Sequence, residues 1–369
     1  MAETIGARLE RFQGVGPGFD LLRVVLASGV VVWHCFPLTT GNARLIDATP
    51  LWFLVNVFVP MFFVVSGFLV TASAHRVMLV SYLLNRVARI VPALFVVVTL
   101  SALVMGPLVT TAPLGSYFAD PLVSRYILNT VGLDAYRLPS VFETLPTPSV
   151  VNGSLWTVRF EYACYVGLGG LVLLGLARRW WPYALAYLLL LLVAVWLAVA
   201  RAAGAEAGAT LPIGEGILPQ AMKVLPYFLL GSLLYVLRDR VPFDARLAAL
   251  AAAAIPAVGL VGEASWLKVP LFWLTLGPVL AYLTVWLGLA RLPKPEILGG
   301  GDFSYGIYLF HFPILQLLVL WTGVRDWWLL ALMAALPALL VAAASWHFVE
   351  KPALVLRKRF SLAGRRAAA

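Results

Sequence analysis

Ionisable side chains interrupt the apolar runs of this sequence at a few places, and chemistry is expected there. Arg23 and His34 lie eleven residues apart within one such run. Eleven steps of about 100° complete three turns plus about 20°, so a helix would present both side chains on one face, about 16 Å apart. The arginine suits an anionic donor and the histidine suits a base for a hydroxyl group. The alternative is an arginine anchored at lipid headgroups and a histidine paired within a helix bundle.

Two further segments combine serine with other polar groups. Ser66 precedes Gly67 in an apolar run. A Ser-Gly pair in a spanning helix favours close helix packing. No Gly-x-Ser-x-Gly motif surrounds this serine, so the sequence does not indicate a nucleophile. Ser154 and Glu161 are seven residues apart and would share one face of a continuous α-helix. Glu161 is a candidate orienting group or second base, and a structural intramembrane ion pair is the alternative.

A stripe of aromatic and histidine side chains occurs near the C-terminus of the chain. Tyr305, Tyr308 and His311 recur every three residues and would line one side of a helix. In an apolar helix such a stripe must face protein or water, because lipid offers no hydrogen bonds. A hydrogen-bonded core histidine explains the pattern as well as a catalytic one.

The remaining candidates are two arginines. Arg86 and Arg89 are three residues apart at the start of a predicted span, and guanidinium groups bind phosphates well. Topology alone is the alternative reason for them. Cys35 and Cys164 lie in apolar runs without metal-ligand spacing, so we expect two buried thiols and no metal. A covalent route through Cys35 is disfavoured, because adjacent helical residues point about 100° apart.

The composition identifies the solvent of this chain as lipid. Hydrophobic residues make up 62% of the 369 residues, charged residues 12%, and the mean hydropathy is +0.92. A soluble protein of this composition would aggregate. The net charge of +10 lies in short clusters between apolar runs, as topology determinants do, so nucleic-acid binding is not expected.

The elements that must position these residues are predicted to be membrane-spanning helices, each of about 20 residues. We predict an all-α integral membrane protein with about ten spans, which form a single membrane domain over 1–355 followed by a basic tail, 356–369. Most Lys and Arg residues fall on the cytoplasmic side if both termini are cytoplasmic. The longest gap, 111–153, is predicted to contain a short helix around 117–129. The predicted spans are 18–38, 51–72, 88–110, 154–177, 182–200, 218–237, 246–262, 269–290, 303–322 and 328–348.

Six ordered motifs together resemble the acyltransferase-3 family of membrane acyltransferases. They are Phe19-Asp20-Leu21-Leu22-Arg23 with His34, Pro60 to Phe68, Arg86 to Pro92, Ser154-Leu155-Trp156 to Glu161, Ser304-Tyr305 to His311, and Phe348 to Pro352.

The resemblance implies transfer of an acyl group, most often acetyl, from cytoplasmic acyl-CoA to a hydroxyl of a carbohydrate, glycolipid or related envelope acceptor. By resemblance His34 is the catalytic base, Arg23 lies beside the donor, and Arg86 and Arg89 suit the CoA phosphates. The bacterial inner membrane is the expected location. Developing oxyanion charge needs a donor, and Arg23, Tyr308 and Ser66 are the candidates. Glu161 and His311 are the candidates for fixing the tautomer of His34.

Two other classes of protein fit parts of the pattern. A multi-helix transporter or flippase of a lipid-linked sugar or small solute also has polar residues at mid-membrane. Such transporters often show repeat symmetry, which this sequence lacks. A non-catalytic membrane scaffold is the second, but it would not require Arg23, His34 and Glu161 to face inward.

Overall fold

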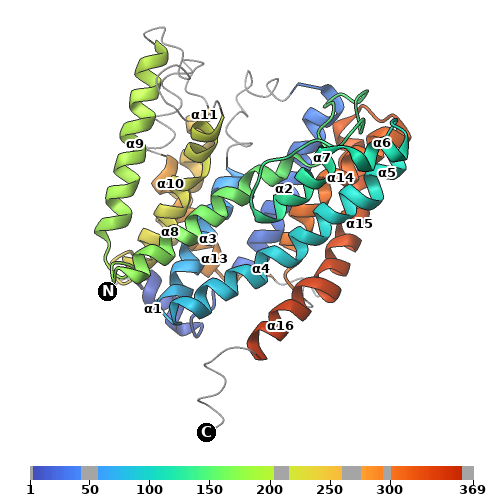
Figure 1. Ribbon diagram of the computed structural model, residues 1–369. Helices are drawn as coiled ribbons and strands as arrows, with labels where there is room; N and C mark the ends of the chain where they lie inside the picture. The colour runs from blue at the N-terminus through green and yellow to red at the C-terminus, as the bar shows by residue number, and fades with distance from the viewer. Residues whose placement is uncertain (1–2, 43–56, 203–215, 260–275, 294–300, 360–369) are drawn as a thin grey trace. The chain divides into compact units, whose positions relative to one another are not determined.

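A computed structural model describes residues 3–42, 57–202, 216–259, 276–293 and 301–359 (Figure 1). The described chain is helical and contains no strand, as the sequence predicts. Contacts divide it into two compact units. The first comprises Met1–Arg23, Leu45–Val77 and Val166–Pro293, and the second comprises Val24–Arg44, Met78–Tyr165 and Lys294–Ala369.

Helices of the first unit are α1 (Ile5–Arg11), α3 (Phe58–Ala74), α9 (Trp181–Ala202), α10 (Ile217–Val236), α11 (Ala245–Gly259) and α13 (Gly277–Leu289). The second unit contains α4 (Leu79–Leu100), η3 (Ser101–Met105), α5 (Gly106–Val109), α6 (Leu114–Ala119), α7 (Pro121–Ile127), η4 (Leu128–Val131), η5 (Gly153–Thr157), α14 (Ser304–Thr322), α15 (Trp327–Ser345), η8 (Trp346–Glu350) and α16 (Lys351–Arg359). Helices α2 (Phe19–Thr40) and α8 (Val158–Leu173) contribute residues to both units.

Close helix packing organises the first unit, where α3 lies against α10. A Cβ atom on Gly67 would overlap the carbonyl oxygen of Phe228, and one on Gly231 would overlap the carbonyl oxygen of Val64. The hydroxyl of Ser232 donates to the Gly67 carbonyl at 3.3 Å. The packing interpretation of the Ser66–Gly67 pair is thus confirmed for the glycine.

The second unit contains long apolar helices and the long segment that connects α5 to η5. Helices α14 and α15 pack against each other, and α4 contacts both α14 and α16 (Figure 1). The predicted helix around 117–129 is present as α6 and α7. Asp120 accepts a hydrogen bond from the Leu122 amide at 2.8 Å, and Pro121 occupies the first turn of α7, so the local sequence accounts for this start.

Five helical segments are long and apolar enough to cross a bilayer: Phe19–Thr40, Leu79–Val109, Ile217–Val236, Ser304–Thr322 and Trp327–Lys358. Shorter apolar helices occupy four further predicted spans, at Phe58–Ala74, Trp181–Leu197, Ala245–Ala257 and Gly277–Leu289. Parts of the predicted spans 51–72, 246–262 and 269–290, and most of the tail 356–369, lie outside the described residues.

Two boundaries differ from the prediction and matter for the site. The span predicted at 88–110 begins at Leu79, so Arg86 and Arg89 lie inside the helix rather than at its start. The span predicted at 154–177 begins with the 3₁₀ turn η5, and α8 starts only at Val158. Because Ser154 and Glu161 do not belong to one continuous α-helix, the seven-residue argument for a shared face does not hold.

Candidate active site

A pair of histidines from α2 and α14 lies in the second unit. Nε2 of His311 is 3.0 Å from Nδ1 of His34, and the two ring centroids are 5.0 Å apart. His311 is fully buried, whereas His34 is half-buried. The polar stripe of α14 therefore faces protein, as the bilayer argument requires.

Backbone carbonyls determine the tautomers of both rings. Nδ1 of His311 lies 3.0 Å from the Ile307 carbonyl oxygen, and a carbonyl can only accept, so this nitrogen carries the proton. Nε2 of His311 is then an acceptor. Nδ1 of His34 lies 3.0 Å from this acceptor and 3.0 Å from the Val30 carbonyl oxygen. Because both neighbours are acceptors, Nδ1 of His34 must carry the proton. Nε2 of His34 is therefore unprotonated and has the free lone pair.

Aromatic and hydroxyl groups surround this pair. The Phe312 ring meets the His34 ring edge-on with centroids 5.2 Å apart, and the Tyr308 ring lies 6.1 Å from that of His311. The Tyr308 hydroxyl donates to the Ser154 carbonyl at 3.1 Å and shares a 2.8 Å hydrogen bond with the Thr157 hydroxyl. These bonds tie α14 to η5 at the level of the histidines.

Asn152 explains why the chain adopts the tight turn η5 at this point. Its side-chain oxygen accepts from the Ser154 amide at 3.1 Å and from the Ser154 hydroxyl at 2.6 Å. Its side-chain nitrogen donates to the Leu309 carbonyl at 2.8 Å. The Ser154 hydroxyl thus helps to build the turn, a role typical of capping residues.

A second polar cluster centres on Arg89, whose guanidinium joins two carboxylates. Nη2 lies 2.6 Å from Asp302, and Nη1 lies 3.0 Å from Glu350. Its charge also sits over the Tyr305 ring, 5.4 Å from the centroid. The hydroxyl of Ser345 donates to Glu350 at 2.9 Å. The arginine therefore connects α4 to the start of α14 and to η8.

Local structure positions both carboxylates of this cluster. Asp302 precedes α14, where it accepts from the Ser304 hydroxyl at 2.5 Å and from the Ser304 amide at 3.3 Å. Glu350 ends the π-helical turn η8, a geometry that often marks functional sites, and is 1% exposed. Sequence reasoning did not propose Asp302, Ser345 or Glu350 as site residues. The available signals were a carboxylate beside a helix start and the acidic residue in Phe348-Val349-Glu350-Lys351-Pro352.

Glu161 belongs with the arginines. The Tyr165 hydroxyl donates to its carboxylate, and the charges acting on it are those of Arg89 and Arg86. Arg159 instead forms an ion pair with Asp134. Glu161 and Arg159 thus interact with other groups rather than with each other. Burial raises the pKa of the Asp134 carboxyl, which lies in the connecting segment, and the Arg159 charge opposes that effect.

Arg86 has a different environment from Arg89, three residues away. Its guanidinium lies 5.7 Å from the Tyr165 ring centroid, and its Nε atom is buried without a hydrogen-bond partner. Within the described residues it forms no ion pair.

The first unit contains the two remaining candidates. On α2, Arg23 forms a 3.5 Å ion pair with Asp20, one turn earlier in the same helix. Ser66 is half-buried on α3. The helix α2 runs without interruption from Phe19 to Thr40, as the spacing argument for Arg23 and His34 requires.

The described residues contain no group of three or more His, Cys, Asp or Glu side chains able to hold a metal ion. Cys35 and Cys164 are free and buried, as predicted.

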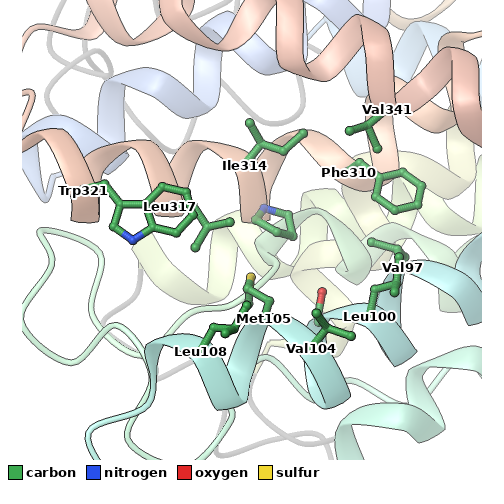
Figure 2. A pocket seen from close by; sticks show the side chains of 12 residues that line it. Val97, Leu100, Val104, Met105, Leu108, Phe310, Ile314, Leu317, Trp321 and Val341 are labelled. Atoms are coloured by element: carbon green, nitrogen blue, oxygen red, sulfur yellow. The ribbon is translucent and has the colours of Figure 1, made fainter.

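An apolar groove of about 310 Å³ lies in the second unit (Figure 2). Figure 2 shows one wall from α4, η3 and α5 and the other from α14 together with Val341 of α15. Apart from Ser101, its lining offers no group able to take part in acyl transfer. Its lining includes Leu100, Val104, Leu108, Phe310, Ile314 and Trp321.

Comparisons with known proteins place this geometry in a family. Residues 17–347 match the family described as acyltransferase domain, which covers most of the chain. Nodulation protein 10 of Rhizobium leguminosarum bv. viciae is 29% identical over 397 aligned positions, which cover 98% of this chain and 99% of that protein. An O-acetyl transferase of Shigella phage Sf6 is 24% identical over 338 positions, covering 90% of this chain and 94% of that protein.

No solved structure matches the chain significantly. The family match and the O-acetyl transferase relative agree with the apolar helices and with the six sequence motifs. The chain therefore belongs to the acyltransferase-3 family of membrane proteins and is an O-acetyltransferase-like enzyme.

Proposed function

We propose that this enzyme transfers an acetyl group from cytoplasmic acetyl-CoA to a hydroxyl of a carbohydrate or related envelope acceptor, with His34 as the general base. The name of the phage relative supports acetyl transfer to oxygen. The observation that carries the proposal is the hydrogen-bonded pair of His34 and His311, which leaves a lone pair on Nε2 of His34.

In the proposed reaction, Nε2 of His34 removes the proton of the acceptor hydroxyl as its oxygen attacks the thioester carbon. The tetrahedral intermediate then collapses, the carbon–sulfur bond breaks, and the thiolate of CoA takes the proton back from His34. General-base catalysis of this kind typically contributes about 10²–10⁴-fold. His311 acts as a positioning residue, because its Nε2 accepts from Nδ1 of His34 and supports the positive charge that His34 gains.

The other polar residues receive supporting roles in this proposal. Tyr308, whose ring lies near His311 in the same unit, is proposed to stabilise the oxyanion, once its hydroxyl turns away from Ser154 and Thr157. Arg23 is proposed to lie beside the donor, and Ser66 is the third oxyanion candidate. Glu161 is proposed to hold the arginine cluster in place through its charge.

The proposed topology determines from which side of the membrane the donor enters. We propose about ten spans with both termini in the cytoplasm of a bacterial inner membrane, a single membrane domain over 1–355 and a basic tail, 356–369. The distribution of Lys and Arg supports this orientation. The donor would enter from the cytoplasmic side, where no further cofactor is required.

The test uses purified protein in nanodiscs, radiolabelled acetyl-CoA and an extract of the host's envelope glycans. Wild type is expected to release CoA and to label the glycans. His34→Ala should bind CoA as wild type does but transfer label at least about 100-fold more slowly, because the general base is lost.

His347→Ala is the matched control, since His347 on η8 is exposed, its Nδ1 bonds the Ala343 carbonyl one turn earlier, and its ring contacts Phe303 rather than the His34–His311 pair. It should retain the wild-type rate. A His34→Ala enzyme with the wild-type rate would overturn the role of His34. A wild type that neither binds nor consumes acetyl-CoA would overturn the proposed donor.

A further inference from the structure

The two arginines of the Arg86–Arg89 motif are in different electrostatic situations. Arg89 is engaged by Asp302 and Glu350, and its guanidinium also lies over the Tyr305 ring. A guanidinium with two carboxylate partners has its charge neutralised and two of its five N–H donors occupied. A phosphate arriving at Arg89 would be repelled by the two carboxylates beside the guanidinium or would have to displace one of them, which is costly. Arg89 is therefore poorly suited to bind a phosphate.

Among the described residues, no carboxylate forms an ion pair with Arg86. One face of its guanidinium lies over the Tyr165 ring, which leaves the N–H groups at the edge for another acceptor. Its Nε atom is buried and makes no hydrogen bond. A buried donor without an acceptor costs about 1–3 kcal/mol, so a ligand that supplies an acceptor there would gain affinity.

A second arginine lies on the C-terminal helix. Helix α16 packs against α4, and the positive charge of Arg86 on α4 acts on Arg357 of α16. Both side chains are half-buried, and neither forms an ion pair within the described residues. Glu161 acts on Arg86 electrostatically without pairing with it.

Two guanidinium groups that repel each other and have no carboxylate partner among the described residues are stabilised by an anion between them. We propose that Arg86 and Arg357 together bind a phosphate group of the acyl donor, whereas Arg89 positions the helices around them. This inference rests on the proposed acyl-CoA donor. It assigns α16, which follows the last predicted span, a direct part in donor binding.

The same phosphate chemistry occurs in membrane lipid headgroups, so the test must separate the two sources. Binding of CoA, 3′-dephospho-CoA and pantetheine is measured by calorimetry on full-length protein in nanodiscs. The measurements are made in neutral phosphatidylcholine and again with added phosphatidylglycerol. No acceptor is needed.

Arg86→Ala and Arg357→Ala are each expected to weaken CoA binding by about 10- to 100-fold, the loss of one or two charge-assisted hydrogen bonds. Pantetheine, which lacks phosphate, should bind all variants equally. Binding of 3′-dephospho-CoA identifies which phosphate is bound. If wild type binds 3′-dephospho-CoA more weakly than CoA, the pair binds the 3′-phosphate. If the two affinities are equal, the pair binds the diphosphate.

Lys358→Ala is the matched control, because it removes one positive charge from the next position of α16, where the side chain is exposed. It should change CoA affinity less than about twofold, as expected for a screened surface charge. An Arg357→Ala protein that binds CoA like wild type would overturn the inference. So would one whose affinity for pantetheine falls as much as its affinity for CoA.

An effect of Arg357→Ala that appears only with phosphatidylglycerol present would assign the pair to lipid and would also overturn it. Failure of wild type to bind CoA at all would instead overturn the proposed donor, and this inference with it. The two failures are therefore distinguishable.

Discussion

The hydrogen bond between His34 and His311 determines what each ring can do. Because Ile307 fixes the proton of His311 on Nδ1, the chain of donors runs from His34 through His311 to a backbone carbonyl. Such an arrangement orients a base much as an Asp orients the histidine of a hydrolase triad, but without adding a negative charge to an apolar bundle.

Replacement of His311 tests this positioning role. His311→Phe removes the acceptor for Nδ1 of His34, so kcat should fall about 10- to 100-fold, within the range that general-base catalysis contributes, while KM for acetyl-CoA stays nearly constant. His311→Gln keeps an acceptor oxygen and should restore part of the rate. Steady-state kinetics in nanodiscs measures both. Equal loss in the two variants, or a large change in KM, would contradict a role through His34.

Arg89 acts at the scale of elements, since it links α4, the start of α14 and η8 through two carboxylates. Arg89→Ala would remove the guanidinium that pairs with the buried carboxylate of Glu350 and with Asp302. Breaking a buried pair in this way costs about 3–5 kcal/mol.

The thermal midpoint in detergent should therefore fall clearly for Arg89→Ala and much less for Arg86→Ala, which removes the same charge but no ion pair. Equal midpoints for the two variants would show that the Arg89 cluster contributes nothing to stability.

Helix contact between α3 and α10 gives a second prediction at this scale. Gly67→Ala introduces a methyl group that overlaps the Phe228 carbonyl, so we expect a loss of about 1–3 kcal/mol from overpacking. Gly167→Ala on α8 is the control, because the added Cβ would have no described atom within 4 Å apart from its chain neighbours and the backbone of its own helix. It should be neutral or slightly stabilising. Thermal or denaturant unfolding compares them, and equal stability would exclude a tight contact at Gly67.

At the scale of the whole molecule, the proposed topology has a direct test. The segment Leu79–Val109 contains 31 residues, long enough at about 1.5 Å per residue to cross a bilayer. Thr111 follows the C-terminal end of this segment and is exposed. Lys358 lies on α16, which packs against α4. We therefore expect Thr111 outside and Lys358 in the cytoplasm.

Single cysteines at these positions test that orientation. A membrane-impermeant maleimide added to intact cells should label Thr111→Cys, and Lys358→Cys should react only after the membrane is opened. The native Cys35 and Cys164 are buried and give a low background. Labelling of both positions from the same side would refute the topology.

The sequence by itself determined the membrane class, the helical architecture and the family. Each follows from local information, because a bilayer excludes unsatisfied backbone and so imposes long apolar helices. The three-residue recurrence of Tyr305, Tyr308 and His311 likewise predicted one inward stripe, since helical geometry depends only on spacing. The number of spans and their orientation stay predictions.

Only the tertiary structure decided which distant side chains meet. Residues 34 and 311 are separated by 277 positions, and no local pattern distinguishes His311 from Glu161 as the partner of His34. Spacing also treated Arg86 and Arg89 as equivalent, whereas packing gives Arg89 two carboxylates and brings Arg86 near Arg357. The physical reason is that ion pairs and hydrogen bonds depend on distances of a few ångströms, which long-range helix packing sets.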